Sequence, residues 1–132
     1  MKRLIILPFA EIDIKETVSF YKEIGDGLEF DFIGEIDSSF IDILKNPKAF
    51  PLVKYDIRKY VMRKFSFSIY YIDRKEALFI LSVFHDKRNP KDWLKRRIKG
   101  WSDVAESLSK IIENLYYTNF VLIEHSYVII GG

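Results

Sequence analysis

The spacing of the apolar residues changes near Tyr55, and this change restricts the fold more than any other feature of the chain. Before it, segments 11–24 and 28–44 carry apolar residues every three or four positions, which predicts two amphipathic helices. Gly25 and Gly27 lie between them, so we expect an antiparallel helical hairpin. After Tyr55 the apolar residues alternate with polar ones, which is typical of β-strands.

Four strands complete the expected fold. One lies at the start, over residues 2–7, and three follow the helices at 57–65, 65–71 and 77–84. Phe and Ile alternate with Ser and Tyr in 65–71, so this strand is expected to be half buried. The sequence therefore predicts an α+β domain: an N-terminal strand, a helical hairpin and a three-stranded antiparallel meander in one sheet.

The last part of the chain is expected to form a separate helix–strand extension. A short basic helix is expected after Pro90, then a helix over 102–114 and a strand over 119–130. The last strand is apolar on both faces and needs cover on both sides. We therefore expect a domain over 1–98 and an extension over 99–132 that packs on the domain or on a second copy and promotes dimerisation.

Composition excludes several classes of protein. Of the 132 residues, 48% are hydrophobic and 30% are charged, which fits a globular domain. The chain has no cysteine and only two histidines, so we expect no disulfide, no metal site and no cofactor, and a location in the reducing cytoplasm. No apolar run reaches the ~18 residues of a membrane span, so no membrane association is expected.

The net charge of +2 hides an uneven distribution along the chain. Residues 1–42 are predominantly acidic, whereas residues 43–98 carry fifteen basic and five acidic side chains. A basic region of this size attracts nucleic acid or an acidic protein. A solvated face balanced by acidic helices explains the same counts equally well.

The candidate chemistry of the chain lies in two groups of basic residues, because no Gly-rich phosphate loop or Gly-x-Ser-x-Gly elbow is present. The first group comprises Lys54, Arg58, Lys59, Arg63 and Lys64. The second comprises His85, Lys87, Arg88, Lys91, Lys95, Arg96 and Arg97. If their strands are neighbours, these side chains converge and can hold a phosphate, whose oxygens accept hydrogen bonds from Lys and Arg.

Several short motifs follow one another in the order found in a known superfamily. They are Asn46-Pro47, Phe50-Pro51, Ile57-Arg58-Lys59, Arg63-Lys64-Phe65, Ile69-Tyr70-Tyr71 and Val83-Phe84-His85-Asp86-Lys87-Arg88-Asn89-Pro90 with Trp93. Together with the helical hairpin, this set resembles the RelE/ParE toxins of type II toxin–antitoxin systems, and most closely the ParE or plasmid-stabilisation branch. The resemblance covers about residues 2–98.

The resemblance implies a growth-inhibiting toxin that is neutralised by a cognate antitoxin protein. ParE-like members of the superfamily poison DNA gyrase, and RelE-like members cut mRNA in the ribosome. A RelE-like mRNA interferase, a metal-independent endoribonuclease, would use Arg63 to clamp the phosphate and His85 as acid or base. Lys87 or Arg88 would stabilise the developing charge. The other basic residues would bind nucleic acid.

Other features of the sequence keep alternatives open. Trp93 stands near where some members keep a terminal Tyr, and an indole cannot act as acid or base. This difference favours gyrase poisoning, or an inactive relative kept as an interaction domain. Structural roles explain the same residues. His85 can be a capped structural histidine, and Arg63 can pair with a helix carboxylate. Trp93 can be a core residue, and 95–97 can form a solvated helix face.

Overall fold

The computed structural model describes residues 2–87 and 127–129. The elements are β1 (Arg3–Ile6), α1 (Pro8–Ile24), α2 (Leu28–Lys45), β2 (Leu52–Lys54), β3 (Ile57–Val61), β4 (Phe67–Asp73), β5 (Ala77–His85) and β6 (Tyr127–Ile129). The α+β class and the order of strand, helical hairpin and strands are confirmed. The helices expected after Pro90 and over 102–114 lie outside the described residues.

The six strands of the described residues form one sheet in the order β2-β3-β4-β5-β1-β6. From β2 to β5 each strand is antiparallel to its neighbour, whereas β1 is parallel to β5 and β6 is parallel to β1. β1 is therefore an internal strand. Its three apolar residues, Leu4, Ile5 and Ile6, are all buried, as is usual for a strand inside a parallel arrangement.

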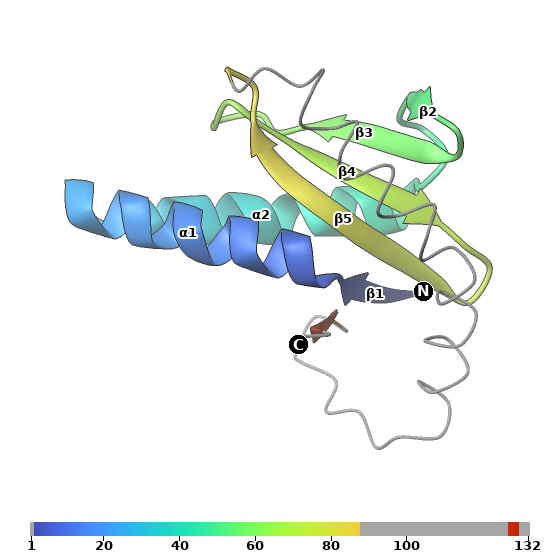
Figure 1. Cartoon of the computed structure of the whole chain (residues 1–132), viewed down its shortest axis with the longest axis horizontal. Helices are drawn as coiled ribbons and strands as arrows, with labels where there is room; N and C mark the ends of the chain where they lie inside the picture. Colours follow the sequence, from blue (N-terminus) through green and yellow to red (C-terminus); the bar gives the residue numbers. More distant parts are fainter. Residues whose placement is uncertain (1, 88–126, 130–132) are drawn as a thin grey trace.

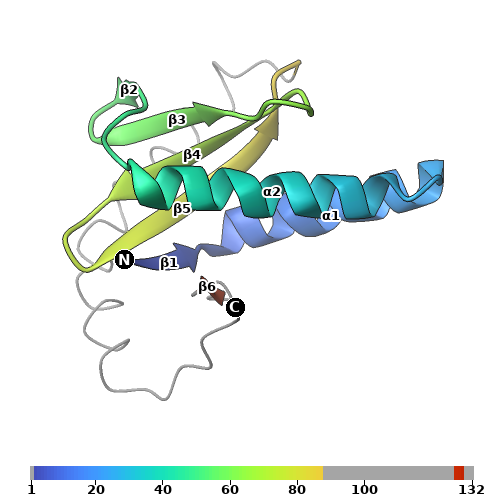
Figure 2. The same ribbon diagram turned by 180° about the vertical axis from the view of Figure 1, so that it is seen from behind.

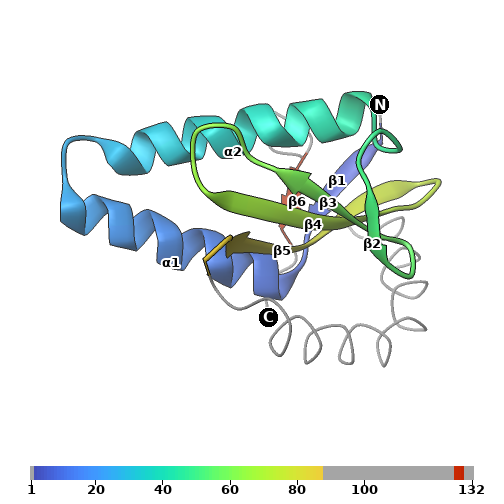
Figure 3. The same cartoon turned by 90° about the horizontal axis from the view of Figure 1, so that it is seen from above.

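The helical hairpin is held by an unusual turn. Gly25, Asp26 and Gly27 all have positive φ angles, of 95°, 61° and 74°, and glycine adopts such angles without strain. α1 begins at Pro8, earlier than expected, because proline fits the first turn of a helix. α2 crosses one face of the sheet, and α1 lies beside it along β5 (Figures 1 to 3).

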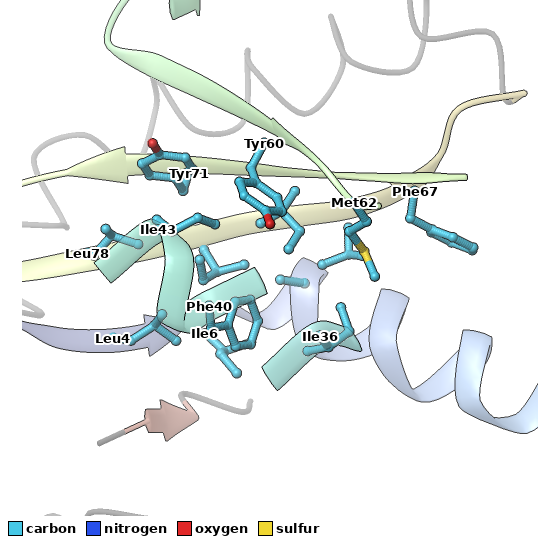
Figure 4. Packing of buried hydrophobic residues seen from close by; sticks show 14 of the residues in the cluster. Leu4, Ile6, Ile36, Phe40, Ile43, Tyr60, Met62, Phe67, Tyr71 and Leu78 are labelled. Carbon is cyan, nitrogen blue, oxygen red and sulfur yellow. The ribbon is translucent and has the colours of Figure 1, made fainter. Parts of the chain in front are cut away.

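The main core lies between the hairpin and the sheet. The apolar stripe of α2 packs against the side chains that one face of the sheet presents, and Figure 4 shows Ile36 and Phe40 beside Ile6, with Tyr60 above them. The aromatic rings of Tyr21, Phe32 and Phe65 contact one another at the hairpin end of this core. These contacts position the ends of β3, β4 and β5 against the two helices.

The strands differ from the expectation in three respects. β2 was not expected, because its three residues are all exposed and show no alternation. β3 ends at Val61 rather than at residue 65, because the Met62 N–H donates to the Phe67 carbonyl (2.9 Å) and the chain turns there. The half-buried strand expected over 65–71 is wrong, since Phe67 to Ile72 are all buried and β4 is covered on both faces.

Candidate functional site

The last members of the first basic group, Arg63 and Lys64, and the first members of the second, His85 and Lys87, lie at or after the ends of strands that finish at the same end of the sheet. Val61, the last residue of β3, pairs with Ser68, and His85, the last residue of β5, pairs with Phe67. The Asp86 N–H also donates to the Ser66 carbonyl (2.8 Å). β4 nevertheless separates β3 from β5, so the two groups are not on neighbouring strands.

His85 lines a cavity of about 320 Å³ between α1 and the ends of β4 and β5. Its wall is acidic and aromatic, and comprises Asp13, Glu16, Thr17, Phe20, Tyr21, Phe67, Val83 and His85. The imidazole meets the Phe67 ring edge to face, with 5.0 Å between centroids. None of the described residues that line this cavity is Lys or Arg.

A backbone contact fixes the orientation of the His85 ring. Its Nδ1 accepts a hydrogen bond from the Lys87 N–H (3.1 Å). In the neutral ring the proton therefore lies on Nε2, which remains a donor. The His85 side chain thus stabilises the turn after β5 through Nδ1, and its Nε2–H is a donor for a second hydrogen bond.

Asp13 is the buried anchor of this cavity, and sequence reasoning missed it. Its Oδ2 accepts a hydrogen bond from the Val83 N–H (3.0 Å), and the residue is only 5% exposed. The last residue of β1, Ile6, pairs with Ile80, so none of the described strands borders β5 on that side beyond this pair. Asp13 satisfies a backbone donor there, and the available signal was an acidic residue three positions after Ala10 on the buried side of α1.

Arg63 lies beside a second cavity, of about 290 Å³, at the other side of the hairpin. Its guanidinium is 3.7 Å from the Asp42 carboxylate on α2. The Tyr60 hydroxyl donates to the same carboxylate (2.8 Å), and burial, together with this bond, raises the pKa of Tyr60. The pairing of Arg63 with a helix carboxylate, left open by the sequence, is therefore present.

The backbone of the turn that carries Arg63 is bound to α2 by the Glu35 carboxylate. Glu35 Oε1 accepts hydrogen bonds from the backbone N–H groups of Arg63 (2.9 Å) and Lys64 (3.0 Å). The Lys64 side chain is left exposed. Glu35 therefore determines where the β3–β4 turn lies, although its role was not visible in the sequence.

The loop between α2 and β2, which contains the Asn-Pro and Phe-Pro motifs, is held by side chains of the sheet. One of them is Arg58. The Arg58 guanidinium donates to the Lys48 (3.2 Å) and Phe50 (2.7 Å) carbonyls. The Tyr71 hydroxyl donates to the Pro47 carbonyl (2.6 Å), and burial raises the pKa of Tyr71 to about 12. These contacts stabilise the loop and orient the Arg58 guanidinium toward it.

The remaining basic candidates do not gather at one place. Lys54 lies over the Tyr55 ring, 5.6 Å from its centroid, at the far edge of the sheet. Lys59 is half buried in β3, and Lys87 is exposed after β5. Arg88, Lys91, Lys95, Arg96 and Arg97, together with Trp93, lie outside the described residues.

Within residues 2–87 and 127–129, no three His, Asp or Glu side chains stand close enough to share a metal ion. No helix in those ranges combines the length and apolar character needed to cross a bilayer.

Comparison with known proteins bears on the fold. No protein-family model and no curated protein matches the chain. Among solved structures, the chain is similar to one described as the chromosomal ParDE TA system from P. aeruginosa, with a TM-score of 0.57 and 16% sequence identity. The match covers 96% of that chain and 64% of this one. The chain therefore shares its fold with a protein of that ParDE TA system.

Proposed function

We propose that this protein is the toxin of a type II toxin–antitoxin pair. It inhibits growth from within the cytoplasm until a cognate antitoxin protein binds it. The ParE/RelE-like fold supports this proposal, and so does the similar structure, whose description names a ParDE TA system. The order of motifs from Asn46 to His85 agrees with the same superfamily.

Inhibition through binding of a protein target, DNA gyrase for a ParE-like toxin, fits the described surface better than RNA cleavage. A metal-independent ribonuclease needs a phosphate clamp and an acid–base group at one phosphate. Arg63 and His85 instead line different cavities. Asp13 and Glu16 line the His85 cavity and repel a phosphate, whereas Arg63 is paired with Asp42 in a cavity that Lys45 also lines. This separation is the observation that carries the choice of mechanism.

The tip of the helical hairpin offers a surface for such a target. Figure 1 shows the far ends of α1 and α2 projecting beyond the strands. Phe20, Ile24 and Phe30 are exposed there, by 59%, 54% and 71%. Large exposed apolar side chains near one another mark a protein-binding surface. Phe20 also lines the His85 cavity, so the tip and the cavity are continuous.

Inducible expression in bacteria, with pulse labelling of DNA and protein synthesis, tests the proposal. We expect DNA synthesis and growth to fall while transcripts remain intact. A double variant, Arg63→Ala with His85→Ala, should inhibit as strongly as the unchanged chain, because neither side chain is then needed for chemistry.

Two other outcomes would replace this mechanism. Rapid loss of protein synthesis with cut transcripts, abolished in the double variant, would identify a RelE-type mRNA interferase that uses Arg63, His85 and Arg88. Normal growth despite soluble protein would identify an inactive relative that serves as an interaction domain.

A further inference from the structure

The sheet has a second apolar face, opposite the main core. Residue alternation assigns to it a set of side chains that are at most 5% exposed: Ile5, Ile57, Tyr70, Ile72, Phe79 and Phe84. Strand register joins them into one surface, because Phe79 pairs with both Ile5 and Ile72. Burial raises the pKa of Tyr70, which agrees with a cover that excludes water.

The described helices do not supply this cover. The buried apolar side chains of α1 and α2 all belong to the main core cluster: Ala10, Phe32, Ile36, Phe40, Ile43 and Leu44. No residue of the second face belongs to that cluster. Figure 2 shows α2 in front of the sheet, and the opposite view in Figure 1 shows β5 in front of α2. The second face therefore needs another part of the chain.

The path of the chain indicates which part is available. It leaves the described domain after β5 and returns as β6, where Tyr127 pairs with Leu4. Leu4 also pairs with Leu78, which precedes His85, the last residue of β5, by seven positions. Between the end of β5 and the start of β6 the chain therefore returns along the strand direction by about seven residues. Seven strand residues span about 23 Å, and a helix over 102–114 would be about 20 Å long. The sequence between the two strands thus has room for a helix that follows the strands.

We propose that the second face is covered by residues 88–126 of the same chain, which pack as a permanent third layer. The expected helix over 102–114 presents one apolar side to the sheet through Val104, Leu108, Ile111 and Leu115. β6 fixes the end of this layer by pairing with β1. The match with the ParDE structure covers nearly all of that chain but only 64% of this one, so part of this chain has no counterpart there.

The absence of cysteine from the 132 residues gives a direct test in the intact chain. Ser82 pairs with Tyr70 on the second face and is 0% exposed, so Ser82→Cys places a single thiol under the layer. Its reaction with a water-soluble thiol reagent should be about 100-fold slower than that of a free thiol, since reaction requires local opening. A rate equal to that of a free thiol would overturn the proposal.

A matched pair of substitutions then identifies the cover. Leu108→Glu puts a charge on the apolar side of the expected helix, and Ser109→Glu puts the same charge about 100° around it. In the Ser82→Cys background we expect Leu108→Glu to speed the reaction at least tenfold and Ser109→Glu to leave it unchanged. Equal effects of the two substitutions would contradict the assignment.

Two controls separate this effect from unfolding and from dimerisation. Ser39 is 1% exposed on α2, on the other side of the sheet, and a Ser39→Cys thiol should stay protected when Leu108 is changed. If Leu108→Glu unfolds the whole chain, a variant with Ser82→Cys and Leu108→Cys decides instead. A bifunctional thiol cross-linker should join the two cysteines within one chain, and a cross-linked dimer, or no cross-link, would sink the proposal.

The inference does not depend on the toxin role. The thiol and cross-linking experiments succeed or fail whether or not expression of the chain inhibits growth. A chain that inhibits growth while Ser82→Cys reacts freely would retain the proposed function and lose only the third layer.

Discussion

At the scale of single residues, one buried carboxylate joins the first helix to the longest strand. Asp13 accepts a hydrogen bond from the Val83 N–H, on the side of β5 where the described pairing with β1 has ended at Ile80. A buried backbone donor left without a partner costs about 1–3 kcal/mol. The position of α1 against β5, and with it the shape of the His85 cavity, therefore depends on this residue.

We predict that Asp13→Ala lowers the free energy of unfolding by about 1–3 kcal/mol, because the Val83 N–H is left unpaired. Urea denaturation measures the change. Glu16→Ala is the control, since Glu16 lines the same cavity from an exposed position on the same helix. Equal decreases in the free energy of unfolding of the two variants would show that the hydrogen bond to Val83 does not contribute measurably to stability.

Because the pKa of Tyr71 is raised, we predict that the free energy of unfolding falls in alkaline solution. Burial raises its pKa from 10.0 to about 12, so the folded state keeps the phenol protonated where the unfolded state ionises it. The stabilisation is complete below pH 10 and is lost as the pH rises toward 12. By pH 11 the Tyr71 contribution should have fallen by about 1.4 kcal/mol, since one pKa unit corresponds to about that energy.

Comparison with Tyr71→Phe isolates this effect. At pH 9 the variant should be less stable by about 1 kcal/mol, because the hydrogen bond to the Pro47 carbonyl is lost. At pH 11 the difference should have closed, because phenylalanine does not ionise. Urea unfolding of both proteins at the two pH values gives the result, and a difference that stays constant would contradict the assignment. Exposed Tyr55→Phe serves as the control.

The sequence was informative about residues whose partners are near in the chain and uninformative about the others. The amphipathic stripe of α2 and the Gly25–Gly27 turn follow from local spacing and are confirmed. Asp13 and Glu35 were missed because their partners lie 70 and 28 positions away. Arg63 and His85 were recognised as candidates, but the separation of their cavities depends on strand order, which composition and spacing do not determine.

At the scale of elements, the hairpin and the edge strand offer two opposite surfaces with similar exposure. Phe30 near the tip of the hairpin and Tyr55 after β2 are each 71% exposed. Neither side chain contributes to the main core cluster, so both are replaceable without loss of the fold. Their comparison separates the surface that binds the target from one that does not.

We predict that Phe30→Ser abolishes inhibition of DNA synthesis and that Tyr55→Ser leaves it unchanged. Both variants should keep a melting temperature within a few degrees of the parent, because exposed positions contribute within about 0.5 kcal/mol. Pulse labelling after induction measures the inhibition, and calorimetry checks the stability. If Tyr55→Ser is the variant that relieves inhibition, the target binds the β2 edge instead of the hairpin.

The prediction of elements from sequence failed where burial and pairing depend on the whole sheet. β2 has no alternation to reveal it, and it exists because residues 52–54 are held beside β3. One face of β4 was expected to be exposed to solvent. Its Ser68 is instead fully buried, and the Ser68 hydroxyl donates a hydrogen bond to the Asp86 carboxylate (2.6 Å). The hydroxyl groups of serine and tyrosine suggest a solvent-exposed face in the sequence. Serine is nevertheless small enough, and the tyrosine ring apolar enough, to be buried.

At the scale of the whole molecule, β6 borders the outer edge of β1, which would otherwise present unpaired backbone groups. We predict that removal of residues 127–132 makes the protein self-associate, because the edge of β1 becomes free to pair with another chain. Light scattering measures the mass in solution. Removal of 130–132 alone is the control, since it leaves β6 in place and should leave the mass unchanged. Equal masses for both deletions would show that the β1 edge needs no protection.

The pairing of β1 with β6 also sets a delay during synthesis. Tyr127, the partner of Leu4, is synthesised 123 positions after it. At translation rates of about 5–20 residues per second, this interval lasts roughly 6–25 s. Throughout that interval at least one side of β1 is unpaired in the nascent chain, so a partner protein that binds during synthesis competes with β6 for the same backbone groups.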